Sequence, residues 1–310
     1  MKTTLKKITR WVFLSVTLTS SLPVFSQQTA QYTNYMYNTA IINPGYTGTR
    51  EALSLFGLHR SQWVGFEGAP VTSSFSAHSP LGDSKTGLGF SFVNEQIGPS
   101  VINDVAVDFA YRISTGNSTL SFGIRGGASI LNVDYNKLDV YDLSDSTFQN
   151  NVDNQFSPNI GAGLYWYSNR HYVGVSVPEF LETKHYLSNQ TSVTQEHMHY
   201  YIMGGYVFNL NENLKLKPAL LGKIVSGAPF QLDAAANVML YDKFTIGGSY
   251  RWNAALSALA GFQITEKIFV GYGYDAETTR MSNYNSGSHE IFLRFELFPK
   301  ETRMDSPRFF

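Results

Sequence analysis

The stretch from Ser118 to Ile130, which reads STLSFGIRGGASI, decides the fold. Its residues alternate between apolar side chains and side chains that are small, polar or charged. Because successive side chains of a β-strand point to opposite faces, this alternation predicts a strand with one apolar and one polar face. The apolar face carries Leu120, Phe122, Ile124, Ala128 and Ile130. The opposite face carries Thr119, Ser121, Gly123, Arg125, Gly127 and Ser129.

The same two-residue period recurs along most of the chain. A transmembrane β-barrel needs strands of about 10 residues that face lipid on one side and a polar interior on the other. We count fourteen such segments, and bacterial outer-membrane barrels have an even number of strands. The segments are 51–60, 70–79, 85–95, 101–113, 118–131, 157–167, 171–178, 197–209, 213–225, 230–240, 243–252, 255–264, 267–275 and 287–298.

The connections between these segments differ in length in a regular way. Those after even-numbered segments are short, as at 114–117, 168–170, 209–212, 241–242 and 265–266. Those after odd-numbered segments include the long stretches 132–156, 179–196 and 276–286. Outer-membrane barrels have short periplasmic turns and longer outer loops. The sequence therefore predicts an all-β fold, a transmembrane antiparallel β-barrel of about 14 strands, with short periplasmic turns, longer outer loops and both chain termini in the periplasm.

The composition favours a membrane barrel over a soluble β-sandwich. Of the 310 residues, 15% are charged and 15% are aromatic, whereas a soluble domain has about 25% charged residues. A sandwich packs its apolar faces together and exposes charged outer faces, but here the second face is mostly Gly, Ser, Thr and Asn. Aromatic residues also gather near segment ends, as girdles at the two membrane interfaces require. They are Trp63, Trp166, Tyr167, Tyr250, Trp252, Tyr272, Tyr274 and Phe298.

Charge and cysteine content exclude several classes of protein. The formal net charge is -1, whereas nucleic-acid binders carry a clustered basic excess. The chain has no cysteine, which excludes disulfides, thiolate metal sites and a lipidated N-terminal Cys. No later apolar run reaches about 18 residues, so no transmembrane helix is predicted.

The first 26 residues are predicted to form a secretory signal peptide. Four basic residues between Lys2 and Arg10 precede the apolar run Trp11–Leu18, and small or polar residues lead up to Ser26. The run is shorter than the roughly 20 residues that span a bilayer. An uncleaved N-terminal anchor is the alternative. The expected localisation is the outer membrane, as an integral protein exported through the inner membrane.

Charged residues of both signs fall on the predicted inward face. On the lipid face, an Arg or Lys at the bilayer midplane would cost about 2–4 kcal/mol. The mixture of signs favours a lumen closed by paired charges over an ion-selective pore with segregated charges. The predicted lumen charges are Asp104, Asp108, Arg112, Arg125, Lys215, Lys217, Lys223, Asp233, Lys243, Arg251, Glu290, Arg294 and Glu296.

No catalytic or metal-binding pattern stands out. His197 and His199 would share one strand face, but a third ligand of comparable placement is lacking. The dipeptide at 289–290 lacks the second His of a zinc-protease helix. No nucleophile elbow accompanies His78 or His171. We therefore expect no enzymatic activity, no cofactor and no metal.

Seven short motifs carry a resemblance to a known family. They are Asn34-Tyr35-Met36-Tyr37-Asn38, Asn43-Pro44-Gly45-Tyr46-Thr47-Gly48, Arg60-Ser61-Gln62-Trp63-Val64-Gly65, Gly68-Ala69-Pro70-Val71-Thr72, Ser76-Ala77-His78-Ser79-Pro80-Leu81, Ile97-Gly98-Pro99 and Ser288-His289-Glu290-Ile291. In order and spacing the chain resembles the PorP/SprF family of outer-membrane proteins of the type IX secretion system. Gly45 and Thr47 depart from the Ala that the family commonly shows, and Asn34 departs from its frequent Gln.

The resemblance implies a non-catalytic component that aids the export or surface retention of a cognate secreted protein. It implies three partners besides outer-membrane lipid: the secreted cargo, periplasmic components of the secretion system and a peptidoglycan-binding protein. It also connects the chain with gliding motility. The outer loops would hold the cargo, and the short turns would meet the periplasmic machinery. The alternative function is an outer-membrane channel or transporter for small solutes.

The lead into the first strand has no strand period of its own. Pro44 restricts Asn43 to extended conformations, and Gly48 permits a sharp turn. We interpret this lead either as a turn that starts the first strand or as a plug or docking segment. The predicted organisation is a signal peptide (1–26), a periplasmic or lumen lead segment (27–50), the transmembrane barrel (51–298) and a periplasmic C-terminal tail (299–310).

Six motif residues are candidate partner contacts. Arg60 and Trp63, at the outer end of the first segment, admit two interpretations. They form an outer binding surface, or Trp63 belongs to a girdle while Arg60 pairs with acidic lumen residues, which we favour. The six candidates are Asn43, Pro44, Gly48, Arg60, Gln62 and Trp63.

Overall fold

The computed structural model describes residues 32–33, 35–82, 85–138, 151–181, 184–186, 192–195 and 197–297. Nearly all the secondary structure in these residues is β-strand. The strands are β1 (Leu53–Ser61), β2 (Val71–Leu81), β3 (Thr86–Ile97), β4 (Ser100–Thr115), β5 (Ser118–Val133), β6 (Val152–Tyr167), β7 (His171–Val177), β8 (Lys184–Tyr186), β9 (Ser192–Gln195), β10 (His199–Tyr206), β11 (Phe208–Asn211), β12 (Leu214–Val225), β13 (Gln231–Leu240), β14 (Phe244–Arg251), β15 (Ala255–Thr265), β16 (Ile268–Glu277) and β17 (Ser288–Leu297).

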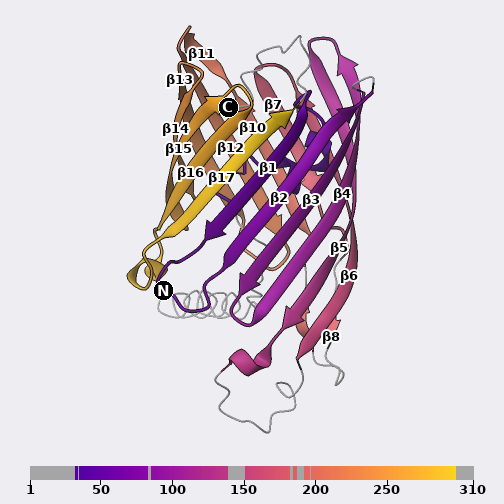
Figure 1. The fold of residues 1–310 in the computed structure, drawn as a ribbon, viewed down its shortest axis with the longest axis vertical. Coiled ribbons are helices and arrows are strands. Elements are labelled where there is room, and N and C mark those ends of the chain that lie inside the picture. The colour runs from indigo at the N-terminus through magenta and orange to yellow at the C-terminus, as the bar shows by residue number, and fades with distance from the viewer. Residues whose placement is uncertain are drawn as a thin grey trace, which may run out of the picture.

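The main sheet is antiparallel and closes into a barrel (Figure 1). Consecutive strands pair from β1 to β7 and from β11 to β17, β1 pairs with β17, and β10 pairs with both β7 and β12. With β10 and β11 counted as one interrupted strand, the wall has 14 strands, which confirms the predicted fold. The short strands β8 and β9 form a separate two-stranded sheet.

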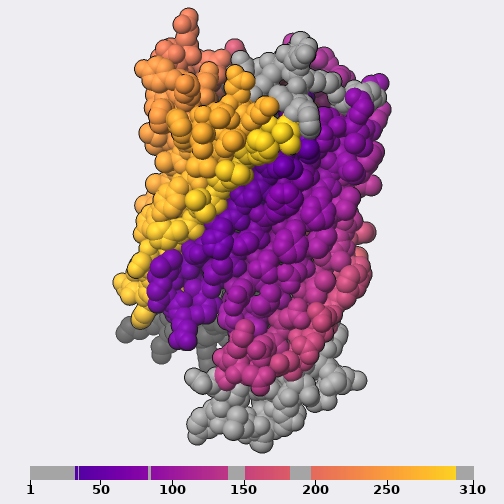
Figure 2. Space-filling view, in the orientation of Figure 1, coloured from indigo at the N-terminus to yellow at the C-terminus, as the bar shows by residue number. Residues whose placement is uncertain are grey.

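The strands turn apolar side chains outward and small, polar or charged side chains inward. In the β4–β5 ladder, Phe109 pairs with Ile124 and Asp108 pairs with Arg125. Ile124 is 63% exposed on the outside, whereas Asp108 is 2% exposed inside. Figure 2 shows the tilted strands of one side of the barrel packed into a continuous outer wall. This arrangement suits a barrel that is surrounded by lipid.

The interruption between β10 and β11 lies opposite a proline. Gly205 pairs with Ala219 and Phe208 with Leu216, so Pro218 of β12 faces the break. Proline has no amide hydrogen to donate to a ladder, which weakens strand pairing at that point. The Val207 backbone N–H instead donates to the Arg170 carbonyl at 2.7 Å, on the other side.

The two ends of the barrel differ in loop length. Short turns follow β4, β6, β11, β13 and β15, and Tyr241 and Asp242 adopt positive φ in the β13–β14 turn. At the opposite end the β5–β6 hairpin extends beyond its neighbours, and β8 lies there as well (Figure 1). We call these the inner and outer ends, because short turns are periplasmic in outer-membrane barrels. Leu53 and Leu297 pair at the inner end, where β1 begins and β17 finishes.

The outer end of the β5–β6 hairpin is closed by side-chain hydrogen bonds. After β5, the 3-10 turn η2 (Tyr135–Lys137) follows Asp134, whose carboxylate accepts from Asn136 and Asn151. These donors, the Asn136 side chain first, hold the pKa of Asp134 below its ordinary value. A second 3-10 turn, η3 (Arg280–Asn283), lies in the loop between β16 and β17.

Two sequence-based placements were wrong. Tyr167 was expected in an aromatic girdle, but it is 8% exposed and shares the inward face of β6 with Tyr165. Its neighbour Trp166 is 41% exposed on the outside, and consecutive residues of a strand cannot both face lipid. Lys243 was expected in the lumen, but it is exposed in the turn before β14.

Several expectations concern residues that the structure does not describe. The signal peptide (1–26), Phe298, the tail (299–310) and much of the outer stretches 132–156 and 179–196 lie outside the described residues. Among the residues that are described, no helix is long and apolar enough to cross a membrane.

Candidate functional site

Residues 32–50, which we call the lumen segment, lie inside the barrel. The segment contains one helical turn, α2 (Thr39–Ile42), and the 3-10 turn η1 (Pro44–Tyr46). Its side chains bond to strands in different parts of the wall: Asn38 bonds to β2, and Asn43 bonds to β6 and β7. Nearly all of its described residues are buried. The segment therefore occupies the lumen.

Asn43 fixes the middle of the lumen segment to the wall. Its side-chain oxygen accepts from the Gly45 backbone N–H at 2.8 Å. Its amide nitrogen lies 3.1 Å from the Leu164 carbonyl, to which it donates, and 3.5 Å from the Val175 carbonyl. Asn43 is extended, with φ -141° and ψ 106°, as a residue before Pro44 should be. One fully buried amide thus joins η1 to two strands.

Inward-facing glycines provide the space for η1. A Cβ on Gly163 of β6 would overlap the Asn43 side chain, and a Cβ on Gly123 of β5 would overlap the Pro44–Gly45 backbone. On β3, a Cβ on Gly87 would overlap the backbone just after η1. The wall and the lumen segment therefore fit together only because these positions carry no side chain.

Aromatic rings pack the lumen segment against both sides of the wall. The ring of Tyr37 stacks on Phe269 of β16 with centroids 5.4 Å apart, and it lies 5.0 Å from Phe292 of β17. Tyr46 packs edge-on against Tyr165 of β6 at 5.4 Å. These rings are buried, so they exclude water from the middle of the lumen.

A predicted lumen charge holds the helical turn of the segment. Arg125 of β5 pairs with Asp108 of β4, with 2.7 Å between Nε and Oδ1. The same guanidinium donates to the carbonyl of Ala40 at 2.7 Å and to the carbonyl of Ile41. A turn as short as α2 leaves such carbonyls without partners of its own. The Arg125–Asp108 pair therefore positions α2.

Gly48 is held on both sides of its peptide unit. Arg112 donates to the Gly48 carbonyl, and the Gly48 N–H donates to His78 Nδ1 at 3.1 Å. The φ of Gly48 is +74°, a left-handed conformation that favours glycine. Gly48, one of the six candidate partner contacts, thus forms its contacts inside the lumen through its backbone.

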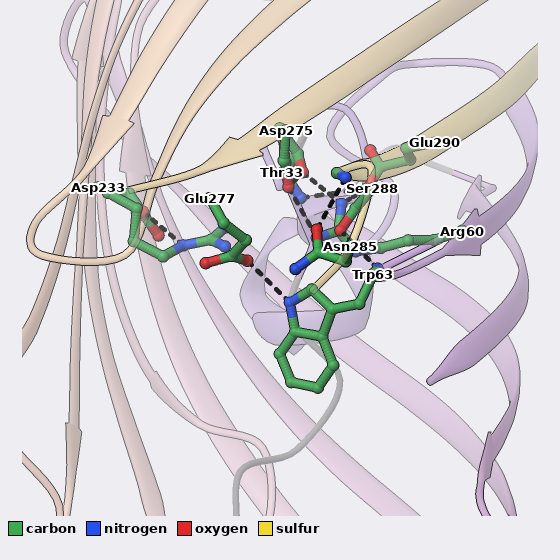
Figure 3. Close-up of polar contacts among 11 residues, drawn as sticks. Thr33, Arg60, Trp63, Asp233, Asp275, Glu277, Asn285, Ser288 and Glu290 are labelled. Atoms are coloured by element: carbon green, nitrogen blue, oxygen red, sulfur yellow. Dashed lines mark hydrogen bonds and ion pairs between the residues drawn. The ribbon is translucent and has the colours of Figure 1, made fainter. Parts of the chain in front are cut away.

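A buried ionic cluster holds the N-terminal end of the lumen segment (Figure 3). Arg60 of β1 lies 2.7 Å from Asp275 of β16 and 3.3 Å from Glu290 of β17. The Thr33 backbone N–H donates to Glu290 at 3.1 Å, and the Thr33 hydroxyl bonds to Asp275 and accepts from Arg60. All four residues are at most 4% exposed. We call Thr33, Arg60, Asp275 and Glu290 the outer cluster.

A second ionic group holds the opposite end of the segment. Arg50 pairs with Glu296 of β17, and Arg294 lies 3.7 Å from the same carboxylate. The Arg294 guanidinium also lies 4.8 Å from the centre of the Phe269 ring. Because Glu296 is the cross-strand neighbour of Ser54, this group is near the inner end.

Trp63 joins two outer loops. Its indole N–H donates to Glu277 at 2.9 Å and its backbone N–H donates to Ser288 at 3.2 Å (Figure 3). The next residue, Val64, donates to the Gly287 carbonyl at 2.9 Å. Trp63 has φ +46°, which is uncommon for a bulky residue, so its surroundings hold it in place.

These contacts define a surface that we call the outer platform, made of the loops 62–70 and 278–287. The Gln62 backbone N–H donates to the Pro70 carbonyl at 2.9 Å, across the base of the first loop. Phe66 is 47% exposed and Tyr284 is 69% exposed. The platform therefore presents large apolar groups on a hydrogen-bonded backbone.

Three further predicted lumen charges, Lys215, Asp233 and Arg251, form ion pairs without a residue of the lumen segment. Arg251 of β14 donates to Asp233 of β13 at 2.9 Å, and both side chains are mostly buried. Lys215 of β12 donates to Asp242 in the β13–β14 turn, so it lies at the inner end.

The remaining predicted lumen charges lie inside the wall. Lys217 is 1% exposed, and its Nζ is 5.5 Å from the centre of the Tyr37 ring. Lys223 is 7% exposed, and Asp104 is half-buried on β4. Apart from Lys243, the predicted lumen charges thus lie on the inner face, whether or not each residue touches the lumen segment.

Sequence reasoning missed three residues of the site. Thr33 and Arg50 belong to a segment without a strand period, which gave no signal for their partners. Asp275 stands in the same alternation as Gly271 and Gly273, and this could have placed it on the inward face. Among the described residues, no group of three or more His, Cys, Asp or Glu side chains is arranged to hold a metal ion.

The fold and the site together define an integral outer-membrane β-barrel whose lumen holds the chain's own N-terminal segment. The family model described as type IX secretion system membrane protein PorP/SprF matches residues 24–295. The chain belongs to this family.

Solved outer-membrane barrels are similar to this chain in fold. Omp33 of Acinetobacter baumannii has 11% identity and a TM-score of 0.46, covering 80% of this chain and 100% of its own. The monoaromatic hydrocarbon channel CymD has 9% identity and a TM-score of 0.49, covering 84% and 93%. The P. putida toluene transporter TodX has 8% identity and a TM-score of 0.44, covering 84% and 92%. No curated protein matches the chain.

Proposed function

We propose that this chain is a non-catalytic outer-membrane component of the type IX secretion system that helps to export or retain one cognate secreted protein. The assignment to the type IX secretion system rests on the family to which the chain belongs. One observation favours a platform over a channel, namely the burial of the lumen. A residue that lines a water-filled pore is exposed, whereas Asn43, Lys217 and Phe269 are at most 1% exposed.

The outer platform is the proposed contact for the secreted protein. Interface cores are enriched in aromatic residues, and Phe66 and Tyr284 offer such groups beyond the strands. Trp63 holds the two loops together, so that the partner meets a surface that is already ordered. Preorganised loops lose less conformational entropy on binding.

The inner end is the proposed contact for periplasmic secretion components and a peptidoglycan-binding partner. Leu210 is 56% exposed and Tyr241 is 66% exposed, both close to short turns. Neighbouring Lys215 and Asp242 add a charged pair at the same end. The signal peptide is proposed to deliver the chain to the periplasm for membrane insertion.

A deletion strain tests this function. Loss of the barrel should remove one surface protein while the uptake of small antibiotics and dyes stays unchanged. A tagged wild-type copy should restore that protein and recover it, together with secretion components, from solubilised membranes. Recovery of neither class of partner, or a change in permeability without loss of a surface protein, would refute the proposal and favour a solute channel.

Variants of the two ends locate the contacts. The double variant Phe66→Ser and Tyr284→Ser should fold but fail to retain the surface protein. Tyr241→Ser, a matched change at the inner end, should retain it. Folding is checked in each case by the altered electrophoretic mobility of unheated barrels.

A further inference from the structure

The lumen segment runs through the barrel from the outer end to the inner end. Thr33 contacts Arg60 and Glu290, which face each other in the β1–β17 ladder next to the outer loops. Arg50 contacts Glu296, seventeen residues later and close to the paired inner ends of β1 and β17. The described chain therefore starts at the outer mouth of the lumen.

Arg60 is the cation that contacts the other three members of the outer cluster. Its guanidinium pairs with both Asp275 and Glu290, and it also donates to Thr33. Arg251 acts on Asp275 as well, through its charge. Removing one member of a buried ion pair leaves an uncompensated charge that is strongly destabilising. Without Arg60, two carboxylates would lie close together at the place where Thr33 docks. Water would then be drawn to this end of the lumen segment.

The rest of the segment is held in a different way. Its middle is fitted against Gly163 and Gly123, and its inner end is covalently continuous with β1. In the described part of the chain, β1 follows Arg50 at the inner end, whereas no strand adjoins Thr33 at the outer end. The contacts of Thr33 therefore restrain the end of the segment that is not continuous with the wall.

We propose that the outer cluster is a latch, and that its release lets the lumen segment withdraw toward the outer face and open the lumen. A force on the chain N-terminal to Thr33, applied from outside the cell, would act directly on this latch. The proposal goes beyond the proposed function, which requires no movement of the segment.

Single-cysteine labelling tests the latch, since the chain has no cysteine of its own. Met36→Cys places a thiol in the partly buried stretch after Thr33, and Thr49→Cys places one at the fully buried inner end. Each reporter is treated, in intact outer membranes, with a membrane-impermeant maleimide added from outside. With Arg60 present, both reporters should label slowly.

The variant Arg60→Gln should label Met36→Cys faster by about tenfold or more, because loss of a buried charge shifts a local opening equilibrium. Thr49→Cys should keep its slow rate, which separates opening of the outer end from unfolding. Arg60→Lys, which keeps the positive charge, should stay close to the wild type.

Arg251→Gln is a graded control, since it removes another buried arginine, whose ion pair with Asp233 joins two strands and whose charge also acts on Asp275. It should accelerate labelling less than Arg60→Gln does. Thr33→Val, which retains every charge, should increase the labelling rate of Met36→Cys less than Arg60→Gln does. If Arg60→Gln does not fold, Thr33→Val still tests the latch. Equal rates in folded Thr33→Val and wild-type barrels, or equal acceleration by Arg251→Gln, would overturn the latch. A deletion strain that loses its surface protein would leave the proposed function standing in either case.

Discussion

The side chain of Asn43 occupies the space that a Cβ on Gly163 would fill. The lumen segment and the wall are therefore complementary at atomic contact, and this fit makes the first prediction. Gly163→Ala should lower the free energy of unfolding by about 1–3 kcal/mol, because an added methyl overpacks a filled interior. Urea titration of the refolded barrel measures the change.

Gly126 supplies the control for that experiment. It lies on the same strand as Gly123, but a Cβ there meets nothing within 4 Å. Gly126→Ala should be neutral or slightly stabilising. A similar loss in both variants would mean that strand glycines matter for pairing and not for the lumen segment.

Asn43→Ala should destabilise the barrel by a comparable amount. The substitution removes the donor to the Leu164 carbonyl and the acceptor for the Gly45 N–H. Leaving buried polar groups without partners costs about 1–3 kcal/mol each. Asn209→Ala, on exposed β11, should change the unfolding midpoint very little. An unchanged midpoint for Asn43→Ala would remove the assigned role of this amide.

Arg125→Met should be among the most destabilising changes in the wall. It leaves the buried Asp108 carboxylate without the guanidinium with which it pairs, and breaking a buried pair costs about 3–5 kcal/mol. Adding Asp108→Asn should recover part of the loss but not all, since the carbonyls of α2 still lack their donor. A double-mutant cycle, with stability measured by urea titration, gives both the loss caused by Arg125→Met and the part that Asp108→Asn recovers. Full recovery would show that Arg125 does not support α2.

A charge on the lipid face should cost stability in proportion to its depth. Ile124→Arg, near the middle of β5, should lose about 2–4 kcal/mol. Ile264→Arg, next to the turn after β15, should lose about 0–1 kcal/mol, because the interface hydrates the charge. Refolding into phospholipid vesicles at increasing urea distinguishes the two. Equal losses would contradict the assigned membrane orientation of these strands.

Trp63→Phe should loosen the outer platform without unfolding the barrel. Phenylalanine keeps the ring but lacks the N–H that bonds to Glu277. Chymotrypsin should then cleave faster at Phe66, while the urea midpoint shifts by less than about 1.5 kcal/mol, the net value of one hydrogen bond. Cleavage at the wild-type rate would show that the backbone hydrogen bond to Ser288 is sufficient to hold the loop 62–70 in place.

The strands were predictable because membrane and lumen impose a strict period of two. Leu120, Phe122 and Ile124 indicate the face of the strand that meets lipid, and Arg125 indicates the face that meets the lumen. The same logic failed at Tyr167, where adjacent aromatic residues at a strand end gave no indication of which ring faced outward. A local pattern reports the face of a strand only while the alternation is clean.

The route of the lumen segment was not predictable in the same way. The motif around Asn43 and Pro44 indicated turns, but the glycines that make room for these residues, Gly163 and Gly123, lie 120 and 79 positions further along the chain. Contacts of this kind depend on closure of the whole barrel, which no short window of sequence encodes. The direction of the segment follows from Thr33 and Arg50, and neither residue carries a local signal.

Pairing of β1 with β17 makes the wall a ring, and the lumen segment is the stretch of chain that immediately precedes β1. The segment touches β2 and β6 on one arc and β16 on the other. Because the segment leads directly into β1 and packs on both arcs, the strand that closes the ring and the segment that fills the lumen are one continuous stretch of chain.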